Sequence, residues 1–185
     1  MRIFSKMNKY CIKSFLGDQL KDYYSTFKDT SFDKKHEQHL CADENVTNVF
    51  NFDEYVSQKF DSPLPASPDA IYLATKKFYF VEFKNSNPKD IDRDNLKNKF
   101  EKGTKILQDL LKEFTPKDVE FIFCVVHKAS TTKSISKYFN PSHIESNVPK
   151  FGLESKNKEL GNFYDRIITE DVDFYKKQLT DLRCR

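Results

Sequence analysis

The sequence predicts an α/β fold in which helices flank a mixed central sheet. Two short β-prone runs, 71–73 and 78–81, are separated by a polar tetrapeptide of hairpin length. Apolar residues then recur at helical spacing over 96–114, and eight mostly apolar residues follow at 119–126. A hairpin, a crossover helix and a buried strand in this order indicate a mixed sheet. At 185 residues, the chain is expected to form one domain, 1–185.

The segment before the hairpin is predicted to be helical at both of its ends. Large apolar residues between positions 10 and 27 fit a helical pattern, whereas 30–48 is polar and is expected to be mostly loop. A short amphipathic stretch, 52–60, follows this loop. It leads into the hairpin, so its acidic residues are near the hairpin along the chain.

The hairpin is predicted to bring three charged side chains together. A turn centred near Thr75 and Lys76 places Asp69 opposite Glu82 or its immediate neighbour. Cross-strand partners lie only about 5 Å apart at Cβ. Glu82 and Lys84 are two positions apart on a strand, so they share one face of the sheet.

These residue types suit metal-assisted hydrolysis of a phosphodiester. A hard cation such as Mg²⁺ or Mn²⁺ prefers carboxylate oxygens, here from Asp69 and Glu82, together with a backbone carbonyl, here that of Phe83. A bound cation lowers the pKa of its water. Lys84 is placed to orient that water or to stabilise charge on the phosphate. A second interpretation stays open, in which Asp69 and Lys84 form an ion pair at the end of the sheet.

Pro68-Asp69 and Glu82-Phe83-Lys84 resemble the motif of the PD-(D/E)xK nuclease superfamily. The resemblance implies a restriction endonuclease-like fold, with an α-β-β-β-α-β core spanning about 53–126. It also implies Mg²⁺-dependent cutting of DNA or RNA. Many members carry a further acidic residue on the helix before the core strands; the resemblance assigns this role to Glu54, with Glu44 as the other candidate.

The elements after the hairpin continue the α/β pattern. Gly103 lies on the apolar stripe of the long helix and is expected where that helix approaches the sheet closely, and Pro116 is expected to end the helix. Beyond the buried strand, 133–139 is predicted as a short helix and 163–168 as a strand. Thr169 is predicted to cap the last helix.

Bulk composition permits nucleic-acid binding without predicting it. The net charge is +3, and the charged residues, 32% of the chain, are interleaved in sign. The long helix carries a group of lysines: Lys97, Lys99, Lys102 and Lys105. They either bind phosphates or form an ordinary solvated face of the helix, and the solvated face is the favoured interpretation. With only four glycines there is no Gly-rich phosphate loop, which disfavours a nucleotide-driven motor or a kinase.

The four cysteines have no motif spacing, and this is typical of a reducing, cytoplasmic setting. His36, His39 and Cys41, with Cys11, form a candidate zinc cluster, but an exposed polar loop is the favoured interpretation because the spacing matches no strong zinc pattern. No apolar run is long enough to span a bilayer, and the N-terminus lacks the apolar core of a signal peptide.

Two functions of different classes follow from these residues. The first is a Mg²⁺- or Mn²⁺-dependent nuclease acting on DNA or RNA, tRNA included, in a toxin-like or defence role. The second is a non-catalytic member of the same fold that binds a cognate protein, as an immunity or accessory protein. A homodimer is compatible with either function.

Overall fold

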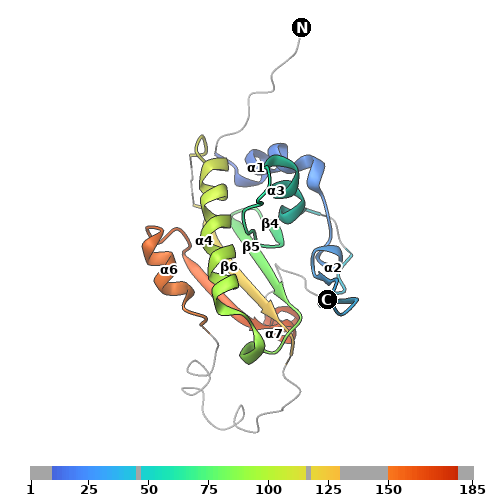
Figure 1. Cartoon of the computed structure of the whole chain (residues 1–185). Coiled ribbons are helices and arrows are strands. Elements are labelled where there is room, and N and C mark those ends of the chain that lie inside the picture. Colours follow the sequence, from blue (N-terminus) through green and yellow to red (C-terminus); the bar gives the residue numbers. More distant parts are fainter. Residues whose placement is uncertain (1–9, 45–46, 116–117, 130–149, 179–185) are drawn as a thin grey trace.

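The computed structural model describes residues 10–44, 47–115, 118–129 and 150–178. A five-stranded mixed sheet with strand order β3-β4-β5-β6-β7 runs through the centre (Figure 1). The pairs β3–β4 and β4–β5 are antiparallel, whereas β5–β6 and β6–β7 are parallel. The predicted mixed α/β architecture is therefore confirmed. The strands are β3 (Val49–Asn51), β4 (Ala70–Leu73), β5 (Lys77–Lys84), β6 (Glu120–His127) and β7 (Arg166–Asp171).

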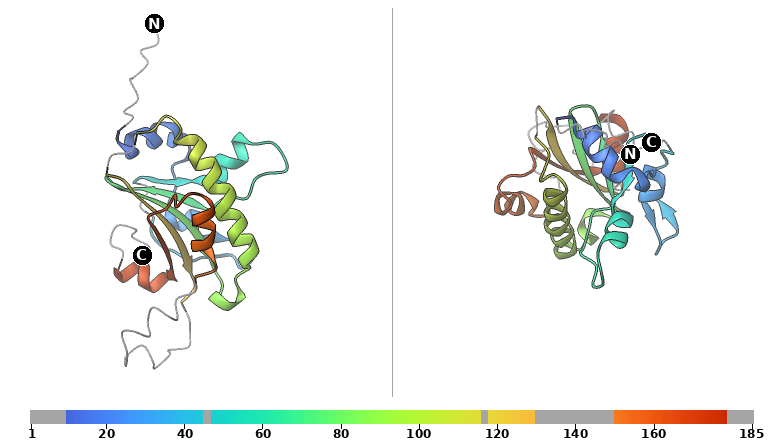
Figure 2. Two further views of the ribbon diagram at one scale, coloured as in Figure 1. Left: turned by 90° about the vertical axis from the view of Figure 1, so that its left-hand side faces the viewer. Right: turned by 90° about the horizontal axis from the view of Figure 1, so that it is seen from above.

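Helices cover both faces of this sheet (Figure 2). One face packs against α1 (Ile12–Leu20), α3 (Phe52–Lys59), α4 (Arg93–Leu110) and α6 (Leu153–Glu159). The other face packs against α2 (Phe27–Thr30) and α7 (Val172–Gln178). The remaining elements are η1 (Lys21–Tyr23), η2 (Pro88–Asp90) and a small two-stranded sheet of β1 (Phe32–Asp33) and β2 (Gln38–His39). In the described parts of the chain, no helix has the length and apolar character of a membrane span.

The β4–β5 hairpin has the predicted turn. Leu73 pairs with Phe78, and the N–H of Ala74 donates to the carbonyl of Lys77 at 2.9 Å, so Thr75 and Lys76 form the turn. At the other end of the hairpin Ala70 pairs with Val81. The next position along each strand therefore sets Asp69 beside Glu82, as predicted.

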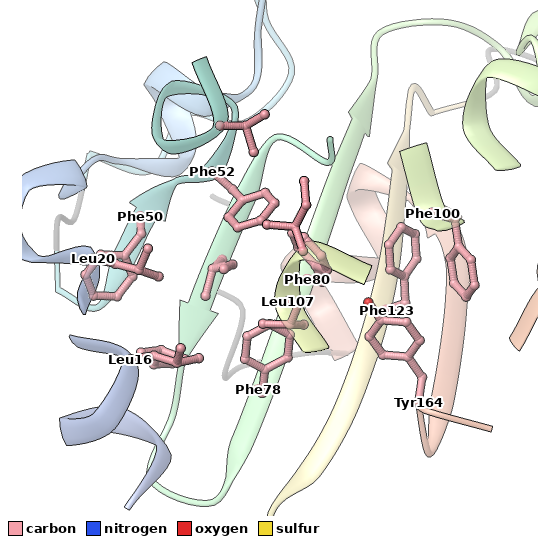
Figure 3. Close-up of a cluster of buried hydrophobic side chains, with 14 of the residues drawn as sticks. Leu16, Leu20, Phe50, Phe52, Phe78, Phe80, Phe100, Leu107, Phe123 and Tyr164 are labelled. Carbon is pink, nitrogen blue, oxygen red and sulfur yellow. The ribbon is translucent and has the colours of Figure 1, made fainter. Parts of the chain in front are cut away.

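The long helix α4 crosses over from β5 to β6, and its apolar face packs on the sheet. Leu96, Phe100 and Leu107 are fully buried. In this packing Phe100 contacts both Phe123 and Tyr164 (Figure 3), with ring centroids 4.6 and 5.3 Å away. Burying each such side chain stabilises the fold by about 1.5–3 kcal/mol. The helix is thereby fixed on the same sheet face as Glu82 and Lys84.

At Gly103, α4 approaches the chain beneath it closely, as expected. A Cβ atom at this position would lie only 2.3 Å from Cδ of Pro68 and 3.4 Å from Cζ of Phe80. Only glycine allows so close an approach without a shift of the neighbouring atoms. The contact packs the helix directly against the residue that precedes Asp69.

Several expectations about secondary structure need correction. The segment 10–27 is not one helix, because it divides into α1, η1 and the start of α2. The last strand runs from Arg166 to Asp171, so Thr169 lies inside β7 and caps no helix. Asp171 takes that role, since its Oδ1 accepts a hydrogen bond from the N–H of Phe174 at 2.9 Å. The long helix ends at Leu110, and both Pro116 and the predicted helix at 133–139 lie outside the described residues.

Candidate active site

Asp69 is held in place by the backbone of two neighbouring segments. Its Oδ2 accepts a hydrogen bond from the N–H of Phe83 at 2.6 Å, and its carbonyl accepts one from the N–H of Phe52 at 3.0 Å. These bonds join the start of β4 to β5 and to the start of α3. The carboxylate therefore has a fixed position, with its Oδ1 directed to other groups.

Glu82 and Lys84 lie next to Asp69 on the predicted shared face. The Glu82 side chain is completely buried, at 0% exposure, and its Oε1 lies 2.7 Å from Nζ of Lys84, whose side chain is 22% exposed. A buried carboxylate is costly unless it is paired with a cation or bound to a metal. The pair meets this requirement and keeps the ammonium group near solvent.

Lys99 of α4 joins these residues, although its sequence pattern had favoured a solvated position. Its Nζ lies 3.1 Å from Oδ1 of Asp69 and 3.0 Å from the Glu82 carboxylate. One ammonium group therefore sits between the two carboxylates. Lys102 and Lys105 of the same helix are exposed, in agreement with the solvated face. The distinguishing signal was the position of Lys99 one turn before Gly103, on the side of the helix that meets the sheet.

The acidic residue that α3 contributes is Asp53, and the structure does not bring Glu54 or Glu44 to the site. Asp53 accepts a hydrogen bond from the hydroxyl of Ser67 and is close enough to interact electrostatically with the cluster. Glu54 is exposed, and its carboxylate accepts a bond from Nε2 of Gln58 at 3.4 Å. Glu44 is also exposed and pairs with Lys28.

Asn51 explains why the helix presents Asp53 and not its neighbour. The side chain of Asn51 caps α3 by accepting a hydrogen bond from the N–H of Glu54 at 3.0 Å. This cap fixes the rotation of the first helical turn, with Phe52 buried in the core. Asp53 then reaches Ser67, in the segment that precedes β4. The sequence alone did not determine which side of α3 faces the site, because a shift of the N-cap by one residue rotates every side chain of the helix about its axis.

The charges of the site do not cancel among themselves. The carboxyl groups of Asp69 and Glu82 both contact the ammonium of Lys99, and that of Glu82 also contacts Lys84. Asp53 interacts with these groups electrostatically. Burial and the negative charge of Glu82 raise the pKa of Asp69 to about 8. Burial of its carboxyl group also raises the pKa of Asp53, although Asp53 as a whole residue is exposed, as Glu54 is.

Lys99 responds to the same excess of negative charge. Burial alone would lower the pKa of Lys99, but the charges of Glu82, Asp69 and Asp53 outweigh it and raise that pKa well above its usual range. The two upward shifts have different main causes: burial for the pKa of Asp69, and the neighbouring carboxylates for the pKa of Lys99. Lys99 therefore stays charged at neutral pH while Asp69 holds on to a proton more readily than a free aspartic acid does.

The Asp69–Glu82 pair fits a divalent cation of the Mg²⁺ type. Such an ion is commonly bound by one or two carboxylates and completes its shell with water and substrate phosphate oxygens. The described ranges contain no group of three or more His, Cys, Asp or Glu side chains that could hold a metal. The carboxylates of Asp69 and Glu82 do converge on a single cation, and in this structure that cation is the ammonium of Lys99. Phe83 contributes backbone only, since its ring packs on the other face of the sheet, 5.8 Å from that of Phe27.

Other candidate residues lie beside or away from this cluster. His127 of β6 pairs with Lys84 of β5, so it lies beside Lys84 on the neighbouring strand. Its Nδ1 lies 3.0 Å from the carbonyl of Lys128. A hollow of about 650 Å³ runs along β7 and α6, and none of the charged residues of the candidate site lines it: Asp53, Asp69, Glu82, Lys84 and Lys99. It is therefore separate from the candidate site.

The proposed zinc ligands do not form a site in the described residues. Nδ1 of His36 lies 2.6 Å from Asp33, and Nδ1 of His39 lies 2.7 Å from the carbonyl of Lys28. Cys41 is buried, whereas both histidines are exposed. Both histidine side chains are thus engaged locally, in agreement with the exposed-loop interpretation for the histidines. Cys41 is disulfide-bonded and offers no thiolate to a metal, a bond that the expected reducing setting did not predict.

The candidate active site therefore combines side chains from α3, from the β4–β5 hairpin and from α4. Carboxylates that suit a hard cation lie beside ammonium groups that suit a phosphate. The five residues are Asp53, Asp69, Glu82, Lys84 and Lys99. Comparisons with protein-family models, with curated proteins and with solved structures found no match for this chain.

Proposed function

We propose that this protein is a divalent-metal-dependent nuclease that hydrolyses phosphodiester bonds in DNA or RNA. The observation that carries the proposal is the convergence of the Asp69 and Glu82 carboxylates on one cation position, with both partners within 3.1 Å of it. Lys84 occupies the next position on the same face of β5. Two acids and a lysine in this order match the chemistry that the hairpin sequence predicted.

The order of the elements supports membership of the PD-(D/E)xK superfamily. The elements α1, β3, β4, β5, α4 and β6 occur in the order α-β-β-β-α-β. The chain adds η1, α2, β1 and β2 between α1 and β3, α3 between β3 and β4, and η2 between β5 and α4. Asp69 stands at the start of one strand, and Glu82 and Lys84 lie toward the end of the next. This is the arrangement that the motif implies.

Each residue has a role in this chemistry. Asp69 and Glu82 would hold Mg²⁺ or Mn²⁺, and Asp53 would hold or orient a water on the ion. The bound ion supplies Lewis acidity and a water of lowered pKa. Lys84 would stabilise negative charge on the reacting phosphate with its ammonium. In hydrolysis the water oxygen bonds to phosphorus and the water gives up one proton, the bond from phosphorus to the leaving oxygen breaks, and the leaving oxygen takes up one proton.

A cleavage assay on mixed substrates tests this proposal. Plasmid DNA, single-stranded DNA, total RNA and tRNA would be incubated with Mg²⁺, Mn²⁺ or EDTA. We expect metal-dependent cutting that Glu82→Gln lacks. The matched control is Glu101→Gln, because Glu101 pairs with Lys105 on the solvated side of α4 and should leave activity unchanged. Cutting that persists in Glu82→Gln protein would place the activity elsewhere or in a contaminant.

A second function is favoured by one observation, the position of Lys99. Its ammonium already compensates both carboxylates, so the cluster is also compatible with a structural ion-pair network in a protein-binding member of this fold, an immunity or accessory protein. In that case Mn²⁺ would leave the melting temperature unchanged, and no substrate would be cut. Partner affinity would then survive Glu82→Gln.

A further inference from the structure

The position of Lys99 raises the question of how a metal ion could enter the site. Nζ of Lys99 lies 3.1 Å from Asp69 and 3.0 Å from Glu82, where a cation bridging the two carboxylates would also lie. Two cations cannot share this position, because like charges at contact distance repel strongly in a partly buried site. Either the ammonium leaves or the metal stays out.

We propose that Lys99 is a displaceable counter-ion, which holds the Asp69–Glu82 pair in the metal-free protein and moves out when a divalent cation binds. This inference rests on the proposed metal-dependent function. It assigns Lys99 a positioning role in the metal-free state. After displacement, the same ammonium is free at the edge of the site to bind a substrate phosphate.

The charge balance favours such an exchange. When the carboxyl groups of Asp53, Asp69 and Glu82 are all ionised and Lys99 is in place, three carboxylates face two ammonium groups, which leaves one negative charge uncompensated. A divalent cation together with Lys84 would compensate all three carboxylates without Lys99. The exchange therefore removes the excess charge, whereas adding a metal beside Lys99 would leave excess positive charge in a largely buried space.

The surroundings of Lys99 allow its side chain to move while the helix stays fixed. One turn further along α4, Gly103 packs against Pro68, and Phe100 is fully buried against Phe123. The backbone at Lys99 is thus anchored on both the loop and the sheet. The lysine itself is 19% exposed and has a flexible four-carbon stem, so its ammonium can swing toward solvent.

The reactivity of Lys99 toward an acetylating reagent tests the displacement in the wild-type protein. Acetylation of each lysine would be measured by mass spectrometry during a Mn²⁺ titration, alongside a calorimetric binding isotherm. We expect the reactivity of Lys99 to rise severalfold with the same midpoint as Mn²⁺ binding. Lys105, which pairs with Glu101 on the solvated side of the helix, is the control and should not change.

The Lys99→Met variant gives an independent readout that requires no activity. Removing the competing charge should make Mn²⁺ binding at least about tenfold tighter, because a cation of the same sign no longer occupies the site. Lys105→Met should bind Mn²⁺ as the wild type does. Should Lys99→Met not fold without metal, the acetylation experiment still decides.

The outcomes separate this inference from the function on which it rests. If Mn²⁺ binds and Asp69→Asn abolishes the binding, but the reactivity of Lys99 stays constant, Lys99 is not displaced and the inference is wrong. Weaker Mn²⁺ binding by folded Lys99→Met would also overturn it. If the wild-type protein binds no Mn²⁺ at all, the proposed metal-dependent function fails together with the inference.

Discussion

Asp69 carries the most unusual electrostatic environment of any residue in the site. The backbone N–H of Phe83 and the ammonium of Lys99 both contact its carboxylate, yet burial and the charge of Glu82 still raise its pKa to about 8. Burial is the largest cause, and the negative charges of Glu82 and Asp53 add to it. The raised pKa makes the stability of the metal-free protein depend on pH.

We expect the free energy of unfolding of the metal-free protein to fall as pH rises from about 4 to about 8. Asp69 has a pKa of 3.8 as a free group and about 8 in the folded protein, so the folded state binds more protons across this interval. Stability must then decrease with rising pH. Asp69→Asn should flatten this slope, which urea unfolding in EDTA at several pH values would measure. Parallel slopes for both proteins would contradict the assignment.

A pair of adjacent substitutions on α3 tests which acid serves the site. Asp53→Asn should weaken Mn²⁺ binding and reduce any cleavage, because Asp53 interacts with the cluster and is held by Ser67. Glu54→Gln should behave as the wild type in both measurements, since Glu54 is exposed and contacts Gln58. The reverse result would show that the helix presents its other acid to the metal.

At the scale of single residues, the hairpin acids were predictable and the helix residues were not. A two-residue periodicity and a short turn determine that Asp69 meets Glu82, and both signals are local. Asp53 and Lys99 depend on the rotation of α3 and α4 about their axes. That rotation is set by the Asn51 cap and by packing at Gly103, which are tertiary properties.

Among the secondary-structure elements, the contact between α4 and the chain before β4 supports the whole site. Gly103 lies against Pro68, so the helix that carries Lys99 and the residue that precedes Asp69 are packed together. Any group larger than hydrogen at position 103 must push these segments apart. The site geometry is therefore sensitive to a residue that carries no charge.

Gly103→Ala should destabilise the protein by about 1–3 kcal/mol in spite of the better helix propensity of alanine, because its Cβ would lie 2.3 Å from Pro68. Gly17→Ala in α1 is the matched control. Nothing lies within 4 Å of its added Cβ, so it should gain up to about 1 kcal/mol from helix propensity. Denaturant unfolding of both variants measures this, and equal effects of the two substitutions would argue against the close contact.

The elements that were predicted well have strong internal periodicity. The hairpin, the long helix and the buried strand β6 each show a pattern that packing reinforces. The strand β7 was misplaced because Thr169 and Asp171 both resemble helix caps in sequence. Parallel pairing of Glu170 with Val126 and of Asp171 with His127 extends the strand past Thr169, and only the partner strand contains that information.

At the scale of the whole molecule, one face of the sheet carries the hydrophobic core at one end and the charged candidate site at the other. Phe78 and Phe80 on β5 are buried under the helices, and Glu82 and Lys84 continue the same row into the candidate site. The change from aromatic to charged side chains occurs within a single strand. Replacing such charges with apolar groups would often stabilise a fold, so their presence in the core is more easily explained by binding than by stability.

The most direct test is the melting temperature of the protein as a function of Mn²⁺ concentration. A ligand that binds only the folded state raises stability by about 2.7 kcal/mol at a hundred times its Kd, or about 5–10 °C for a chain of this size. We expect a rise of this order in the wild type, its loss in Asp69→Asn and in Glu82→Gln, and its retention in Glu101→Gln. An unchanged melting temperature in the wild type, or a rise that survives both site substitutions, would contradict a metal site between Asp69 and Glu82.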